Sequence, residues 1–160
     1  MTTPAEHSQK PHVLITAGGS GIGLAMAKAF LDNDAKVAVT DTDMDALTAA
    51  QSIYPELLVF QADVTDAAAM TAVFDDLMAS WSRLDVLMAN AGIAGPTAAI
   101  ENITLDDWKR CLAVNLDGSF IAANLAVPIM KAQQSGVITL TSSTAGEWGY
   151  PFRSPYAAAK

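Results

Sequence analysis

Short apolar runs alternate along the chain with longer segments that have helical periodicity. Five runs rich in Val, Ile and Leu have strand length, at residues 12–16, 36–40, 57–61, 84–88 and 136–141. Between them, apolar residues recur at helical spacing over about 24–31, 43–52, 66–81 and 105–133. Strands that alternate with helices are typical of right-handed crossovers and a parallel sheet. The pattern predicts an α/β fold.

Polar residues and a proline mark the expected helix ends. Asp43 or Asp45 is placed to cap the second helix, and Thr104 to cap the long one. Pro128 is expected to bend the long helix or to end its regular part. We expect residues 1–11 to form a flexible tail and residues 12–160 to form one domain.

Composition narrows the class of protein. A chain of 160 residues suits one domain, and 51% hydrophobic with 16% charged residues fits a sheet covered on both faces. The net charge of −8 argues against nucleic-acid and anionic-membrane partners. No export signal and no apolar run of about 20 residues is visible. The single cysteine, Cys111, fits a small core residue in a reducing, cytoplasmic compartment.

A glycine-rich turn follows the first strand. It consists of Gly18, Gly19, Ser20, Gly21, Ile22 and Gly23. Such a turn lets the backbone approach a pyrophosphate at the helix N-terminus, where free N–H groups favour anions. A tight connection without a ligand remains the alternative. We expect Ala17, just before these residues, to keep a negative φ, because its Cβ is tolerable only then.

Asp41 ends the second strand, eighteen residues after Gly23. This is near the spacing of about 20 expected for a carboxylate that binds the adenosine ribose hydroxyls. The carboxylate would repel a 2′-phosphate, and neither Ser20 nor Thr42 offers a cation to attract one. These residues favour NAD over NADP. The alternative is that Asp41 only caps the strand end.

The last eighteen residues carry the chemistry. Ser143 is followed by Tyr156 thirteen residues later and by Lys160 four residues after that. Tyrosine is a weak acid, with an unperturbed pKa of about 10, and a nearby cation favours its phenolate. Positions i and i+4 share one face of a helix, which would bring Lys160 to Tyr156. Ser142 rivals Ser143, although the spacing favours Ser143; the alternative for Tyr156 and Lys160 is that both are plain surface residues.

Together these motifs resemble the short-chain dehydrogenase/reductase family. The resemblance rests on Thr16–Gly23, Asp63-Val64-Thr65, Asn90-Ala91-Gly92, Asn115, Ser143 and the pair Tyr156 and Lys160. The resemblance implies a Rossmann-type, doubly wound parallel sheet with strand order 3-2-1-4-5. It also implies an NAD site in which Asp63 and Val64 contact the adenine ring, and Asn90, Ala91 and Gly92 support the sheet and the cofactor.

The resemblance further implies oxidation of an alcohol or reduction of a ketone by hydride transfer. Tyr156 would move the proton, Ser143 would bond the substrate oxygen, and Lys160 would lower the tyrosine pKa and hold the nicotinamide ribose. Asn115 would hold a water molecule that relays protons, although an asparagine in a helix also serves simply to contact the neighbouring turn. Epimerisation or dehydration with the same pair is a further alternative.

Family members continue beyond this lysine. We therefore expect the chain to be a segment of a longer protein, with the strand at 136–141 as an exposed edge through Val137, Ile138 and Leu140. A catalytically silent dinucleotide-binding or interaction module is the competing function. Homodimers or homotetramers, as in relatives, are expected for a complete chain.

The two histidines, His7 and His12, are expected to be solvated, and no metal site is expected. A substrate pocket is expected to be lined by two segments, Ile93–Thr97 and Glu147–Arg153. Its aromatic and charged side chains suggest a polyol, sugar or cyclic alcohol, unless they only pack the loop.

Overall fold

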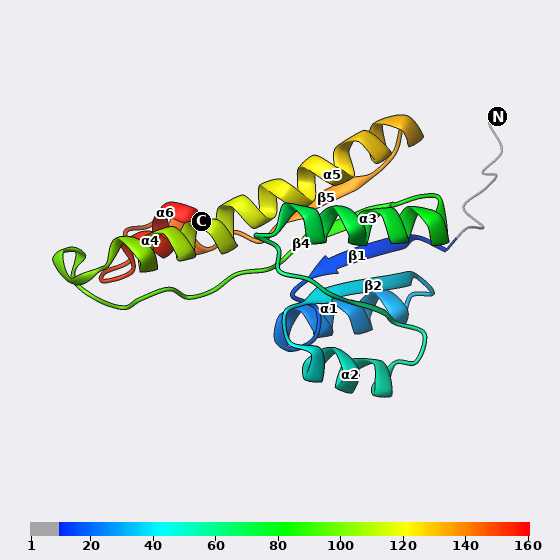
Figure 1. Ribbon diagram of the computed structural model, residues 1–160, viewed down its shortest axis with the longest axis horizontal. Helices are drawn as coiled ribbons and strands as arrows, with labels where there is room; N and C mark the ends of the chain where they lie inside the picture. The colour runs from blue at the N-terminus through cyan, green and yellow to red at the C-terminus, as the bar shows by residue number, and fades with distance from the viewer. Residues whose placement is uncertain (1–9) are drawn as a thin grey trace, which may run out of the picture.

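A computed structural model describes residues 10–160 (Figure 1). Five strands form one sheet in the order β3-β2-β1-β4-β5, and every pairing is parallel. The strands are β1 (His12–Thr16), β2 (Lys36–Asp41), β3 (Leu58–Gln61), β4 (Val86–Ala89) and β5 (Val137–Leu140). The predicted α/β class and strand order are confirmed.

Six α-helices accompany the strands in the described part of the chain. They are α1 (Gly21–Leu31), α2 (Met44–Ile53), α3 (Ala67–Trp81), α4 (Leu105–Leu112), α5 (Gly118–Gln133) and α6 (Ser154–Ala159). Side-chain caps begin three of them: Asp43 accepts from the N–H of Ala46, and Asp66 and Thr104 cap α3 and α4 in the same way. Of the two alternatives for the second helix, Asp43 is the cap.

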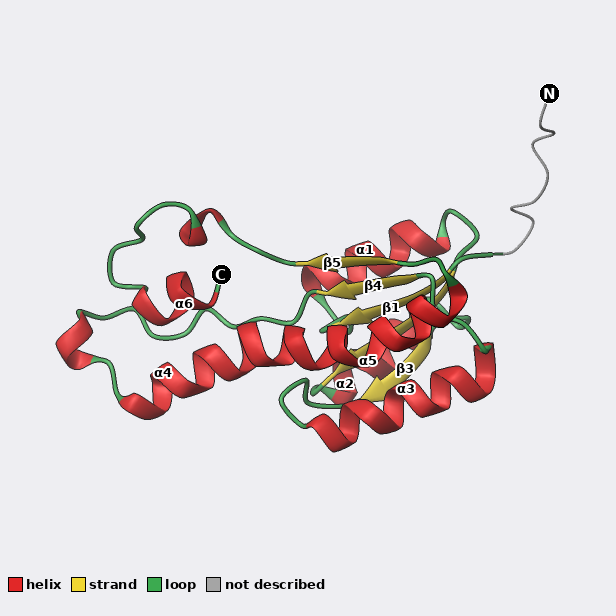
Figure 2. Ribbon diagram, turned by 90° about the horizontal axis from the view of Figure 1, so that it is seen from above, coloured by secondary structure: helices red, strands yellow, loops and turns green. Residues whose placement is uncertain are grey.

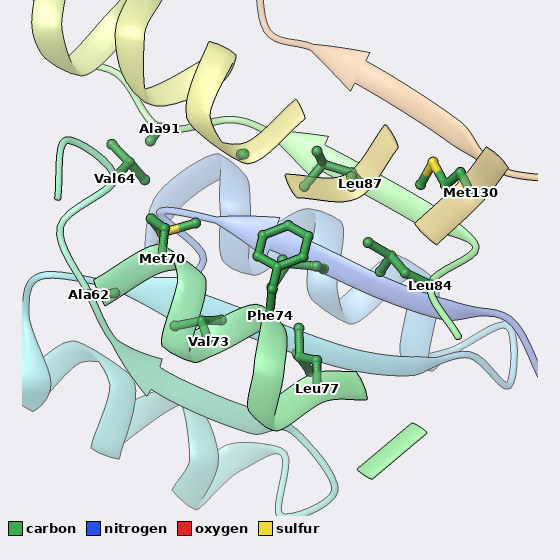
Figure 3. Close-up of a cluster of buried hydrophobic side chains, with 14 residues drawn as sticks. Ala62, Val64, Met70, Val73, Phe74, Leu77, Leu84, Leu87, Ala91 and Met130 are labelled. Atoms are coloured by element: carbon green, nitrogen blue, oxygen red, sulfur yellow. The ribbon is translucent and has the colours of Figure 1, made fainter. Parts of the chain in front are cut away.

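Helices cover both faces of the sheet. Helices α3 and α5 lie on one face, and α1 and α2 lie on the other (Figure 1). Successive side chains of a strand point to opposite faces, so Leu14 joins the cluster under α3 and α5 while Val13 and Ile15 join the other cluster. Fully burying one such side chain contributes about 1.5–3 kcal/mol. Figure 3 shows the first cluster, with Phe74 and Leu77 of α3 packed toward Leu87 of β4.

The long helical run from Leu105 to Gln133 is interrupted at a position that differs from the expected one. Pro128 lies inside α5, which continues to Gln133, so of the two expected effects of Pro128, ending the regular part is wrong. The carbonyl that loses its donor belongs to Asn124, an exposed residue, so water can bond it. The regular bonding changes instead at Ala113–Asp117, a π-helical segment.

The same run corrects the expectation that no segment has membrane-spanning length. By length and composition, Leu105–Gln133 is long and apolar enough to cross a membrane, with a mean hydropathy of 1.4 in its most apolar window. The sequence shows no uninterrupted run because polar residues are distributed through this helix. Helix α5 packs on the sheet face beside α3, where Ala122, Ala126 and Met130 are buried.

His12 is buried, with 7% of its surface exposed, which corrects the expectation that it is solvated. Its ring stacks on Trp81 at a centroid distance of 5.0 Å, and its Nδ1 lies 3.6 Å from Asp85. Burial lowers the pKa of His12, and Lys36 lowers it further, against the opposing effect of Asp85. His7 lies outside the described residues, as do residues 1–9 of the expected tail.

Strand β5 pairs with β4 on one side and has no strand on its other side in residues 10–160. Val137 and Leu140 are 58% and 56% exposed, as predicted for an edge. Ile138 is the exception, because it packs against the cluster under α5. The strand is therefore covered on one face and open along its edge.

Candidate functional site

The candidate residues lie where the strands end. The carboxyl ends of the strands point toward α4 and α6 (Figure 2). The glycine turn follows β1, Asp41 ends β2, Asn90 follows β4 and Ser143 comes three residues after β5. In open α/β sheets, ligands bind at this edge beside the point where the strand order reverses, which here lies between β1 and β4.

Thr16 links the chain after β1 to the chain after β4, at the point where the strand order reverses. Its buried hydroxyl oxygen accepts from the backbone N–H of Asn90 at 2.9 Å and of Ala91 at 3.0 Å. The side-chain amide of Asn90 in turn donates to the carbonyls of Thr16 (3.1 Å) and Ala17 (3.3 Å). Asn90 therefore bonds directly to the chain at the start of the glycine turn, and its role toward a cofactor stays a prediction.

Close approach explains two of the glycines. An ideal Cβ atom on Gly23 would lie 2.0 Å from the carbonyl oxygen of Ala17, and one on Gly18 would lie 2.5 Å from the side chain of Val39. Gly21 has a φ of +53° and faces open space. Residues at the start of a helix have N–H groups without intrahelical partners. The turn therefore presents unpaired N–H donors in a space that admits an anion.

Ala17 does not keep the negative φ that we expected. Its φ is +51°, in the left-handed region. A Cβ in this region costs roughly 1–2 kcal/mol, because it crowds the following carbonyl oxygen. The alanine is therefore strained in a turn that Thr16 and Asn90 hold in place.

The Asp41 carboxylate already has backbone partners. Oδ2 accepts from the N–H of Gly19 at 3.0 Å, and Oδ1 accepts from the N–H of Asp43 at 3.2 Å. Each carboxylate oxygen can accept more than one hydrogen bond. Asp41 therefore caps the strand end and keeps acceptor capacity for a ligand, so its two alternatives are compatible.

A pocket of about 200 Å³ opens beside Asp41. It is lined by Ala17, Asp41, Thr42, Ala62, Asp63, Val64, Ala91, Gly92, Ile93, Arg110 and Val114. Five of the predicted cofactor residues are in this lining. Asp63 also folds back locally, because its Oδ1 accepts from both the N–H and the hydroxyl of Thr65.

Sequence reasoning missed Arg110 and Val114. Arg110 and Val114 lie four residues apart and so share one helix face. Val114 directly precedes Asn115, and Arg110 lies about one helical turn before Val114. That spacing was the available signal. Arg110 places a cation at this pocket, where the sequence had indicated only the carboxylates of Asp41 and Asp63.

Asn115 lies in the π-helical segment and is 3% exposed. Its amide nitrogen donates to the carbonyls of Ile93 (3.0 Å) and Cys111 (2.8 Å), and its Oδ1 accepts from the N–H of Ile93 at 3.2 Å. Single π turns inside α-helices are frequent at functional sites. Asn115 thus contacts the neighbouring turn, as the structural alternative proposed, and also fixes the loop after β4.

Gly92 brings Asn115 and Lys160 together. An ideal Cβ on Gly92 would lie 2.7 Å from Asn115 Oδ1 and 3.3 Å from Lys160 Nζ. Lys160 Nζ lies 5.8 Å from the ring centroid of Tyr156 and donates to the carbonyl of Thr141 at 2.7 Å. Three predicted residues from distant parts of the chain therefore meet at one point, and α6 brings Tyr156 beside them.

The two serines have different partners. Ser142 donates its hydroxyl to the carbonyl of Lys160 at 3.0 Å. Ser143 accepts from the N–H of Ala145 at 3.2 Å, and its own proton has no acceptor within residues 10–160. Ser143 therefore has a donor free for a ligand, whereas Ser142 is occupied. The preference for Ser143 as the catalytic serine stays a prediction.

Cys111 is a buried residue, as expected. It lies beside Gly95, and burial raises the pKa of its thiol. Across residues 10–160, no group of three His, Cys, Asp or Glu side chains is arranged to hold a metal ion.

Comparison with known proteins matches residues 11–160 to the family model described as short chain dehydrogenase. A curated relative from Sphingomonas sp. (strain SKA58), 2-dehydro-3-deoxy-L-rhamnonate dehydrogenase (NAD(+)), is 34% identical over 92% of this chain and 59% of the relative. The chain thus spans about three fifths of the length of the curated relatives it matches.

Solved structures agree with this match. The crystal structure of a xylitol dehydrogenase with NAD⁺ bound has a TM-score of 0.88 and 28% identity, over 94% of this chain and 59% of that chain. The structure of ElxO with NADP bound has a TM-score of 0.89 and 28% identity, over 94% of this chain and 62% of that chain. Similar structures therefore include proteins with either dinucleotide.

The strain at Ala17 predicts the outcome of one substitution. Ala17→Gly should raise the free energy of unfolding by roughly 0.5–1 kcal/mol, because relief of the left-handed Cβ exceeds the added chain entropy of glycine. Thermal and urea unfolding measure this change. Ala25→Gly, at an exposed position inside α1, is the matched control and should lower stability by roughly 0.5–1 kcal/mol. If Ala17→Gly and Ala25→Gly lowered the free energy of unfolding equally, the assignment of strain to Ala17 would be contradicted.

Proposed function

The chain belongs to the short-chain dehydrogenase family, and on that premise we propose that it interconverts a secondary alcohol and a ketone with NAD(H). The observation that carries the proposal is the meeting of Lys160, Tyr156 and Asn115 beside Gly92. This meeting point lies at the same edge of the sheet as the glycine turn and the pocket beside Asp41.

The described residues fit a dinucleotide along this edge. The glycine turn offers unpaired N–H groups to a pyrophosphate, and Gly18 and Gly23 have no room for a side chain. Val64 and Ala91 line the pocket where the adenosine would lie, and Asp41 would accept from its ribose hydroxyls. The nicotinamide, when bound, supplies the hydride chemistry.

Tyr156 is the proposed acid and base, which gives a proton to the ketone oxygen or takes one from the alcohol. Lys160 Nζ lies 5.8 Å from the ring centroid of Tyr156, so a cation is close to the proposed acid and base. Ser143 donates its free hydroxyl to the substrate oxygen and stabilises charge that develops there. Asn115 holds the loop at Gly92, and its Oδ1 is near the lysine, as a proton relay through water requires.

A polyol, sugar or cyclic alcohol is the proposed substrate class. The relatives named for xylitol and for a dehydro-deoxy-rhamnonate support the first two members of this class. Near the site, Trp148, Tyr150 and Phe152 are largely exposed, which supports their use as a wall for a ligand more than as packing of their own loop.

A homodimer or homotetramer is the proposed assembly, in the cytoplasm. An exposed apolar face runs along the long helical run through Leu105, Leu116, Phe120 and Val127. Such a patch is typical of protein interfaces.

Light scattering should therefore report an oligomer for the wild type and a smaller species for Phe120→Glu. An unchanged mass in Phe120→Glu would exclude this face as the interface between subunits.

Tyr156→Phe should lower turnover by about 10²–10⁴-fold, because the ring is kept and only the proton donor is removed. Dissociation of NAD should change by less than about threefold. Absorbance of NADH, followed with NAD and xylitol, sugars or cyclohexanol, measures the first quantity, and fluorescence titration measures the second.

Tyr54→Phe, at the end of α2 and away from this edge, is the control and should leave both values unchanged. Turnover that survives Tyr156→Phe would contradict the assignment of the tyrosine. A folded wild type that binds NAD and oxidises none of the alcohols would favour the silent binding module.

Asp41→Asn tests the preference for NAD. The amide keeps an acceptor for Gly19 and removes the charge that repels a 2′-phosphate. The ratio of the NADP and NAD dissociation constants should fall by about tenfold or more, since juxtaposed like charges cost more than 1 kcal/mol. A wild type that prefers NADP, with the preference lost in Arg110→Gln, would show that Arg110 decides the cofactor.

A further inference from the structure

Arg153 is held between two tyrosines just before α6. Its Cζ lies 5.9 Å from the ring centroid of Tyr156 and 6.0 Å from that of Tyr150. Its Nη1 donates to the carbonyl of Ala94 at 2.7 Å. The guanidinium is therefore fixed beside the proposed acid and base.

The same contacts join the loops after β4 and β5. Besides the bond from Arg153 to Ala94, the N–H of Ala98 donates to the carbonyl of Phe152 at 2.9 Å. These are the two segments that the sequence identified as walls of a substrate pocket. Arg153 therefore lies in one of these segments, is half-buried, and bonds to the other segment.

Arg153 has no carboxylate partner among the described residues. Lys10, Lys28 and Arg83, in contrast, each pair with an aspartate. The single bond to Ala94 leaves most of the five N–H donors of the guanidinium without an acceptor in this part of the chain.

The second cation at the same ring, Lys160, likewise makes no ion pair with a described carboxylate. Two cations thus approach Tyr156 within 6 Å, from Arg153 and from Lys160. Lys160 has a proposed role toward the cofactor and the tyrosine. The charge of Arg153 has no role in the proposed reaction.

We infer that Arg153 binds a carboxylate on the substrate, so that the substrate class is a hydroxy acid or keto acid with the acid group a few bonds from the reacting carbon. This inference rests on the proposed function, which it narrows. A planar guanidinium matches a carboxylate with two parallel N–H···O bonds, and an arginine already fixed by a carbonyl and two rings loses little freedom on binding. The bond to Ala94 alone would need only one donor.

The test compares acids with their neutral esters. The substrates are cis-4-hydroxycyclohexanecarboxylate and 3-hydroxybutyrate, each beside its methyl ester, with NAD and the full chain. The variants are Arg153→Gln, which removes the charge, and Arg153→Lys, which keeps the charge and loses the planar fork. Lys109→Gln removes a charge from the exposed surface of α4 and is the control.

The wild type should prefer at least one acid over its ester. Arg153→Gln should raise KM for that acid by about 10–100-fold, the range for a lost hydrogen bond to a charged group, with little change in kcat or in KM for the ester. Arg153→Lys should recover part of the loss. Lys109→Gln should match the wild type, and NAD dissociation should be the same in all four proteins.

Three results would overturn the inference. Equal losses on acid and ester would show that Arg153 only fastens the two loops. Turnover of the esters without preference for either acid would leave the oxidoreductase intact and exclude the carboxylate site. If no alcohol is turned over, calorimetric titration of the two acids into the NAD complex replaces kinetics. Binding that Arg153→Gln abolishes would support the site, and no binding would exclude it.

Discussion

The reversal of strand order between β1 and β4 is the constraint on which the site depends. Two crossovers leave the sheet there in opposite directions and open the edge between them. The buried hydroxyl of Thr16 accepts hydrogen bonds from two backbone N–H groups after β4, and the side-chain amide of Asn90 donates two hydrogen bonds to carbonyls at the end of β1 and just after it. These bonds fix the glycine turn relative to the loop at Gly92, so both ends of a dinucleotide would meet one rigid frame.

The remaining site residues are attached to this frame by polar contacts from elements far apart in the sequence. Asn115 binds both the N–H and the carbonyl of Ile93 from inside a π-helical segment, and Lys160 reaches the same place from the residue after α6. Arg153 fastens the outer part of the loop at Ala94. The loop after β4 thus lies beside three candidate side chains, and it would connect the proposed cofactor side of the site with the proposed substrate side.

Local sequence patterns predicted the strands and the main helices because apolar periodicity directly reflects which face is buried. The strand order was predicted only from the resemblance to the family. They failed where a backbone conformation is imposed from outside. The left-handed φ of Ala17 follows from bonds made by Asn90, which is distant in sequence. The π turn at Asn115 and the burial of His12 against Trp81 likewise depend on tertiary partners. The pocket residue Arg110 was missed because its role depends on which helix face meets the sheet edge.

A crystal structure of the chain with NAD tests the central claim most directly. The account predicts the pyrophosphate at the N–H groups of Gly21 and Ile22, the adenosine in the pocket beside Asp41, and the nicotinamide ribose within hydrogen-bond distance of Lys160 Nζ. NAD bound away from the β1–β4 edge, or bound there with its nicotinamide remote from Tyr156, would contradict it.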